Sequence, residues 1–151
     1  MDCVGEANKI LRHYNDLQQA EENLNKRISR LVAQAGPRDL TAVDIEDAIK
    51  AAGAKDTTLN IIFELKQLTD ARDRTRAELD RIDSILAAMV EEKDCLFYTP
   101  VLRAWYIDLV PKDQIARTIG YSSKRSIYTI KNQALRKFAC KMFGIKALEA
   151  L

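Results

Sequence analysis

The chain has 151 residues, of which 47% are hydrophobic and 30% are charged. This length fits one domain, or a small domain with an extended helical element, and the low count of five Gly and three Pro favours an all-α fold. No hydrophobic run approaches the roughly 18 residues that span a membrane, and the polar N-terminal residues do not resemble a secretory signal, so we expect no membrane partner.

The charge is unevenly distributed along the chain. The formal net charge is +2, but residues 1–99 carry 14 Lys and Arg against 19 Asp and Glu, whereas residues 100–151 carry 10 against 3. The C-terminal third is therefore the part expected to contact a polyanion. A solvated basic face is the alternative interpretation.

The cysteines and the histidine give no sign of a metal site. Cys3, Cys95 and Cys140 have no CxxC spacing, and their odd number favours reduced thiols in the cytosol, with Cys140 half-buried. His13 is the only histidine and has no second ligand at a suitable spacing. We therefore predict no zinc site.

A long amphipathic helix is predicted from about Glu6 to Ala35, ending at Gly36-Pro37. Its seam follows an unbroken four-three heptad spacing, typical of a coiled coil, through Ile10, Tyr14, Leu17, Glu21, Leu24, Ile28, Leu31 and Ala35. A connector at about 38–55 follows, with a short helix capped by Thr41 and stopped by Gly53. This connector is predicted to pack over the end of the helical pair, with a docking surface as the alternative.

A second long helix is predicted to begin near Thr57 or Thr58 and to end at about residues 93–97. It continues the heptad spacing through Ile61, Leu65, Leu68, Arg72, Thr75, Leu79, Ile82, Leu86 and Met89. Two such helices joined by a compact connector predict a long antiparallel hairpin over residues 1–98. In the expected register Glu21 approaches Arg72 to form an ion pair in the seam. The alternative is that both side chains reach solvent.

A C-terminal module is predicted over residues 99–151. Thr99-Pro100 is a capping residue followed by proline at the first helical position, so a helix should run from Pro100 to about Leu109. Its inward residues are expected to be Val101, Leu102, Trp105 and Leu109, with Trp105 in the core rather than stacking on a ligand. Residues 142–151 form an apolar tail that packs on the hairpin or on a second subunit.

Two further helices flank a predicted turn at Gly120. The first covers about Lys112 to Thr118 and buries Ile115, Ala116 and Ile119, and Gly120 is expected to adopt a left-handed conformation. Ser122 or Ser123 then caps a second helix that runs past Phe138. Its buried residues are Ile127, Ile130, Ala134 and Phe138, and its opposite face carries Arg125, Thr129, Asn132 and Arg136. A short helix, a glycine turn and a basic helix predict a helix-turn-helix.

The residues of this module resemble region four of bacterial sigma factors, and resemble still more closely the sigma-region-four-like helix-turn-helix of phage and prophage late-gene regulators. The resemblance lies in Tyr106-Ile107-Asp108, Asp113-Gln114-Ile115-Ala116, Ile119-Gly120-Tyr121-Ser122, Ile127-Tyr128 and Ala134-Leu135-Arg136-Lys137, within about Thr99 to Lys141. In this chain the interval between Tyr121 and Ala134 is one residue longer than in the sigma pattern, which shifts the aligned base-reading positions by about one residue. The resemblance implies a phage-type transcriptional regulator in the bacterial host cytoplasm, associated with the nucleoid.

Double-stranded DNA is the expected partner of this module. Arg125 is suited to guanine, and Thr129 and Asn132 are suited to thymine methyl and adenine edges. Cationic and hydroxyl side chains around them are suited to phosphate. The full predicted DNA-binding set is Lys112, Arg117, Ser122, Ser123, Lys124, Arg125, Ser126, Thr129, Lys131, Asn132, Arg136 and Lys137. For each residue alone, a solvated side chain is the alternative.

Neither an enzyme nor a cofactor is expected, because the sequence contains no GxSxG, GxxxxGK[ST] or HExxH motif. Two other functions remain open: a modulator that binds RNA polymerase or a sigma factor, and a coiled-coil adaptor that does not bind DNA. A homodimer through the hairpin or the C-terminal tail is expected, because it would match paired DNA half-sites.

Overall fold

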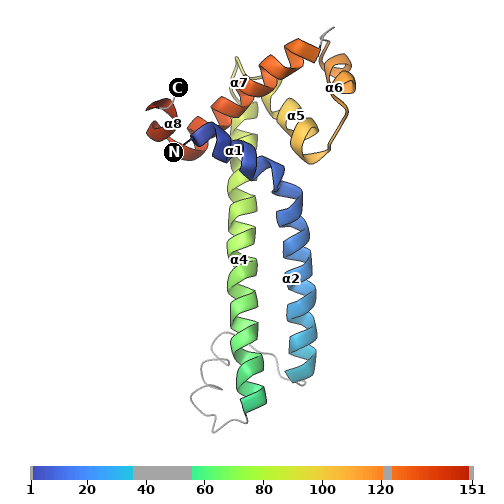
Figure 1. Cartoon of the computed structure of the whole chain (residues 1–151), viewed down its shortest axis with the longest axis vertical. Helices are drawn as coiled ribbons and strands as arrows, with labels where there is room; N and C mark the ends of the chain where they lie inside the picture. The colour runs from blue at the N-terminus through green and yellow to red at the C-terminus, as the bar shows by residue number, and fades with distance from the viewer. Residues whose placement is uncertain (1, 36–55, 121–123, 150–151) are drawn as a thin grey trace. The chain divides into compact units, whose positions relative to one another are not determined.

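The computed structural model of the chain describes residues 2–35, 56–120 and 124–149, and every regular element among them is a helix (Figure 1). The all-α class expected from the sequence is confirmed. The chain divides into two compact units: residues 17–78 form one, and residues 1–16 together with residues 79–151 form the other. We call them the insert unit and the terminal unit. The short helix expected after Thr41 lies outside the described residues.

The first predicted helix is divided into two, which corrects the expectation of one continuous helix from Glu6. Helix α1 spans Cys3–Arg12 and begins earlier because the Asp2 carboxylate accepts a hydrogen bond from the Gly5 N–H at 3.0 Å. Helix α2 spans Tyr14–Ala35. At His13 (φ −95°, ψ 5°) the backbone leaves helical geometry. The break is followed by contacts made within the terminal unit, including a 2.9 Å hydrogen bond from the Asn15 amide to the Ile107 carbonyl.

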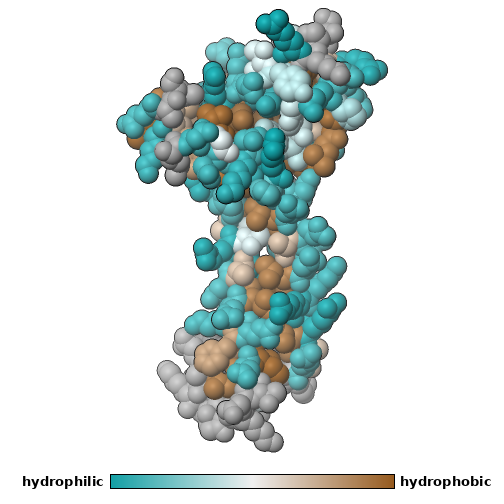
Figure 2. Space-filling model, in the orientation of Figure 1, coloured by the Kyte–Doolittle hydropathy of each residue, from teal (hydrophilic) through white to brown (hydrophobic). Residues whose placement is uncertain are grey.

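In the insert unit, α2 runs antiparallel to α4, which spans Asp56–Val90. Leu31, Leu65 and Leu68 are buried between them, with Leu24, Ile28, Val32 and Ile61 packed around this core. On the face seen in Figure 2, hydrophobic residues of this unit follow the line where the two helices meet. The heptad spacing therefore identified the apolar faces of both helices.

The expected ion pair between Glu21 and Arg72 is wrong by one helical turn. Arg76 Nη1 instead lies 2.8 Å from Glu21 Oε2, while Arg72 contacts Asp73 at 3.1 Å and the Asn25 side chain at 3.4 Å. Arg27 and Glu64 form a further interhelical pair at 2.6 Å. Each of these pairs has at least one substantially exposed side chain, so their expected contribution to stability is small.

The terminal unit combines α1 and the end of α4 with the C-terminal helices. These are α5 (Tyr98–Leu102), the π-helix η1 (Arg103–Ile107), α6 (Lys112–Ile119), α7 (Lys124–Phe143) and α8 (Ile145–Glu149). Helix α7 packs against α1, α5, α6 and α8, and Figure 1 shows the start of α1 beside the end of α7. The compact units therefore do not divide at the expected residue 98, because Cys3, Ala7 and Leu11 of α1 are buried within the terminal unit.

The segment after α4 differs from the prediction in its cap and in its inward face. Phe97, not Thr99, occupies the N-cap of α5, and the buried Thr99 hydroxyl donates to the Leu86 carbonyl at 2.7 Å. Tyr106, rather than Leu109, points into the unit and donates to the Asn8 side chain at 2.7 Å. The π-helix accounts for the change of face, because its hydrogen bonds span five residues, as from the Asp108 N–H to the Arg103 carbonyl.

Leu109 ends this segment in a left-handed conformation (φ 52°) and is 70% exposed. A left-handed conformation strains a leucine by about 1–2 kcal/mol, whereas glycine adopts it freely. We expect Leu109→Gly to raise the free energy of unfolding by about 0.5–1 kcal/mol. This figure is the relieved strain minus the cost of the extra conformational entropy that glycine gives the unfolded chain. Chemical denaturation would measure the change. Leu109→Ala is the control, because it removes the same exposed side chain and keeps the strain, so an equal gain from both variants would contradict this explanation.

Candidate nucleic-acid interface

Helices α6 and α7 share one hydrophobic core. It contains Val101, Ile115, Ala116, Ile127 and Ile130, each at most 9% exposed. Helix α6 begins after Pro111, close to the expected residue, and ends at Gly120, whose φ of 84° confirms the predicted left-handed stop. A Cβ at Gly120 would meet nothing within 4 Å, so the backbone conformation, and not lack of space, favours glycine there.

The two faces of α7 lie as the spacing predicted. Ile127, Ile130, Ala134 and Phe138 are buried. Arg125, Thr129, Asn132 and Arg136 on the opposite face are exposed. The Thr129 hydroxyl donates to the Arg125 carbonyl one turn earlier at 3.1 Å, which occupies its proton and leaves its oxygen able to accept. The exposed face therefore presents two guanidinium groups, a carboxamide and a threonine side chain along a 20-residue helix.

The remaining predicted DNA-binding residues are placed less uniformly. Ser122 and Ser123 lie outside the described residues, and Lys124 begins α7 without a described side chain. The exposed Arg117 donates from Nε to the Asp113 carbonyl at 3.4 Å within α6. Ser126 is half-buried. These positions leave Arg117 at the surface and place Ser126 partly inside the fold.

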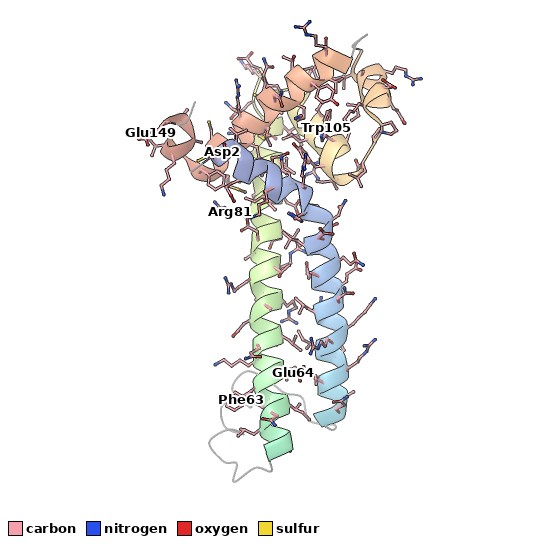
Figure 3. The ribbon with its side chains drawn as sticks, in the orientation of Figure 1. Asp2, Phe63, Glu64, Arg81, Trp105 and Glu149 are labelled. Carbon is pink, nitrogen blue, oxygen red and sulfur yellow. The ribbon has the colours of Figure 1, made fainter. Side chains whose placement is uncertain are left out.

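Lys112 and Lys131 converge on two aromatic rings. Their ammonium groups lie 4.9 and 5.1 Å from the centroid of the Trp105 ring, and 6.0 and 5.9 Å from that of Tyr128. The two rings meet edge to face with centroids 5.0 Å apart. Figure 3 labels Trp105, on the η1 segment. Trp105 is half-buried and packs on the α6–α7 core as expected, but its ring also meets these two cations.

Arg12, the last residue of α1, lies within electrostatic range of Lys131. Partial burial is the main reason that the pKa of Lys131 is lowered, and the positive charges of Arg12 and Lys112 lower it further. Arg12 was not among the predicted site residues. It is 100 residues from Lys112 in the sequence, and only the packing of α1 into the terminal unit brings it near.

Lys137 has a carboxylate partner, Glu92. Its Nζ lies 2.8 Å from Glu92 Oε2, and Lys141 contacts the other oxygen of the same carboxylate. The Cys95 thiol also donates to Glu92 at 3.4 Å. The hydrogen bonds from Lys137 and then Lys141 lower the pKa of Glu92 to about 2, and the bond to Glu92 raises the pKa of Lys137. Glu92 thus binds α7 to the segment that follows α4.

This ion pair predicts an acid-sensitive contact. Because the pKa of Glu92 is lowered on folding, its contribution to stability is present above its ordinary value of 4.5 and is lost as the pH falls toward about 2. We expect Glu92→Gln to destabilise the protein at pH 7 and to have progressively less effect between about pH 4.5 and pH 2. Denaturation at several pH values would measure this. The matched variant Lys137→Gln should raise the pKa of Glu92, observed by carboxyl NMR, and an unchanged titration would contradict the assignment.

The His, Cys, Asp and Glu side chains of the described residues form no candidate metal site. No group of three or more His, Cys, Asp or Glu side chains within residues 2–35, 56–120 and 124–149 could hold a metal ion. Cys3, Cys95 and Cys140, all among the described residues, form no disulfide. Cys140 is half-buried as expected, and burial raises the pKa of the Cys95 thiol. None of the described helices has the length and hydropathy needed to cross a membrane.

Comparison of the chain with protein-family models, with curated proteins and with solved structures finds no match.

Proposed function

We propose that α6 and α7 form a helix-turn-helix, that α7 enters the DNA major groove, and that the protein is a sequence-specific transcriptional regulator of the phage or prophage type. Arg125, Thr129 and Asn132 are its base-reading residues, and Arg117 and Arg136 contact phosphates beside them. In this proposal the paired helices α2 and α4 of the insert unit take no part in DNA binding. The proposal includes no catalytic activity and no cofactor.

One observation carries the proposal. An eight-residue helix and a 20-residue helix share a core across a left-handed glycine, and the longer helix exposes Arg125, Thr129, Asn132 and Arg136 on the side opposite that core. This face combines groups that donate to guanine and to adenine edges with a hydroxyl that suits either base pair. The excess of positive charge in residues 100–151 supplies the attraction to phosphate.

The test is binding of the full chain to fluorescent random-sequence duplex DNA at several salt concentrations. We expect the affinity to fall steeply with salt, because each phosphate contact releases counterions and contributes about 0.9 to the logarithmic slope. Selection of bound sequences should then give one preferred site. The double variant Arg125→Ala/Arg136→Ala should bind weakly, whereas Lys26→Ala/Lys66→Ala in the insert unit should bind normally. Absence of binding at low salt would overturn the proposal.

A second candidate, binding to RNA polymerase or to a sigma factor, is favoured by exposed hydrophobic residues beside α7. Leu96 is 67% exposed and Phe97 is 37% exposed, and both line a pocket of about 240 Å³ with Ile130 and Gln133. Exposed apolar residues around a pocket are typical of protein contacts. Leu96→Ser would separate the two functions: loss of promoter-dependent transcription with unchanged duplex binding would favour the second candidate.

A further inference from the structure

We propose that Arg12, Lys112 and Lys131 together bind one phosphate group of the DNA backbone, on a surface built around Trp105 and separate from the base-reading face of α7. The inference deepens the proposed function and rests on it. It adds α1, at the opposite end of the chain, to the DNA-binding surface.

The three side chains come from three different elements of the terminal unit. Arg12 is the last residue of α1, Lys112 is the first residue of α6, and Lys131 lies in the middle of α7. The buried residues of α1 and the hydrogen bond between Tyr106 and Asn8 fix α1 against this unit. Asn8 and Asn15, on either side of Arg12 in the sequence, bond to Tyr106 and Ile107, so the fold brings Arg12 to the segment that carries Trp105.

The three cations have no ion-pair partner among the carboxylates that the structure describes. Among residues 2–35, 56–120 and 124–149, no Asp or Glu forms an ion pair with Arg12, Lys112 or Lys131. Contact with an aromatic face attracts a cation but leaves its charge intact. The lowered pKa of Lys131 agrees with this, since burial and the two neighbouring cations all disfavour its charged form. An anion bound among the three groups would remove this repulsion.

The aromatic pair places the two lysines for such an anion. Both ammonium groups lie within 5.1 Å of the Trp105 centroid, so the same ring holds both lysine side chains. Holding a lysine against a ring before binding reduces the side-chain entropy that is lost on binding. Two ammonium groups and a guanidinium supply several N–H donors, and the nonbridging oxygens of a phosphodiester accept several hydrogen bonds. Such contacts position the protein on DNA without reading its sequence.

The first experiment measures duplex binding of the full chain with Arg12→Gln, Lys112→Gln and Lys131→Gln. We expect each variant to weaken binding by about 3- to 10-fold on every sequence and to reduce the logarithmic salt slope by about one. Lys66→Gln and Arg74→Gln, two exposed positions of the insert unit, are matched controls. Lys131→Arg keeps the charge and should retain most of the affinity. Affinities and slopes equal to those of the controls would overturn the inference.

The second experiment uses inorganic phosphate and the fluorescence of Trp105, the only tryptophan. Titration with phosphate, against chloride at equal ionic strength, should change the emission of the wild type and not that of Lys131→Gln. If Arg125→Ala weakens duplex binding but Arg12→Gln does not, the inference fails and the proposed function stands. If duplex DNA does not bind but phosphate changes the emission, the proposed function fails and the anion site stands as a site for another phosphate ligand. No response to either would overturn both. Thermal melting of each variant would establish that it is folded.

Discussion

We expect Phe138→Ala to lower the free energy of unfolding by about 3–5 kcal/mol, the largest effect of any single change considered for this protein. Phe138 lies on α7, has no exposed surface and is the largest of the fully buried side chains that the structure describes. Its truncation removes apolar contacts and leaves a cavity in the unit that holds both α1 and α7. Because a domain of this size is stable by only about 5–15 kcal/mol, the variant should lose a large share of its stability and unfold at a markedly lower denaturant concentration.

Phe63→Ala provides the matched control for this prediction. The substitution is chemically the same, but Phe63 on α4 is 48% exposed, so much less buried surface is lost (Figure 3). Denaturant unfolding followed by circular dichroism would compare the two variants. Near-equal losses would show that Phe138 is not packed as described.

Arg125→Ala is expected to weaken binding to the preferred DNA site by about 1–3 kcal/mol, the cost of losing a two-point hydrogen bond to guanine. Arg125 is exposed in the first turns of α7, on the side opposite buried Ile127 and Ile130. Its removal leaves that core intact, so the melting temperature should be unchanged. Competition binding with the selected site and with single-base variants of it would measure the loss of affinity. It would also identify the base position at which Arg125→Ala no longer discriminates between bases.

The pattern of loss decides the role of Arg125. A reduction confined to the preferred site identifies a base contact, whereas an equal reduction on all sequences, with a smaller salt slope, identifies a phosphate contact. Arg74→Ala in the insert unit is the control for the loss of one positive charge. If Arg125→Ala binds DNA as tightly as this control, Arg125 is not part of the DNA-binding interface.

Much of the helical structure follows from local patterns. Apolar spacing of three and four residues identified the buried faces of α4 and α7, because the helical period alone decides which side chains share a face. Gly120 marked the end of α6 because a left-handed residue is nearly free of strain only when it lacks a Cβ. These features depend on residues within one or two turns of each other, which sequence patterns record.

The errors arise where distant contacts decide the conformation. The break at His13 has no glycine or proline to mark it, and the chain that follows it is held by Asn15 and by the 2.6 Å hydrogen bond from Tyr14 to Asp83. The π-helix turned Tyr106, not Leu109, inward for the same reason, since Tyr106 finds Asn8 at the other end of the sequence. Glu21 pairs with Arg76 rather than with Arg72, one turn away on the same helix, and heptad spacing does not decide which of the two arginines reaches it.

The candidate site was likewise anticipated only in part. Periodicity placed Arg125, Thr129, Asn132 and Arg136 on the exposed face of α7. It could not show that Glu92 pairs with Lys137, because that carboxylate lies on a different segment. Lys137, which was predicted to contact phosphate, therefore pairs with a carboxylate of the protein itself. The role of these residues in DNA binding stays a prediction.

The arrangement of the terminal unit bears on how the chain folds during its synthesis. Helix α1 packs against α7, yet more than 100 residues separate them, and the whole insert unit is made in between. At about 5–20 residues per second, a ribosome needs roughly ten seconds to cover that interval. During this time the apolar side of α1 has no native partner, while the pairing of α2 with α4 can already be complete. Synthesis therefore assembles the middle of the chain before its ends, and the surface proposed to bind DNA is completed last.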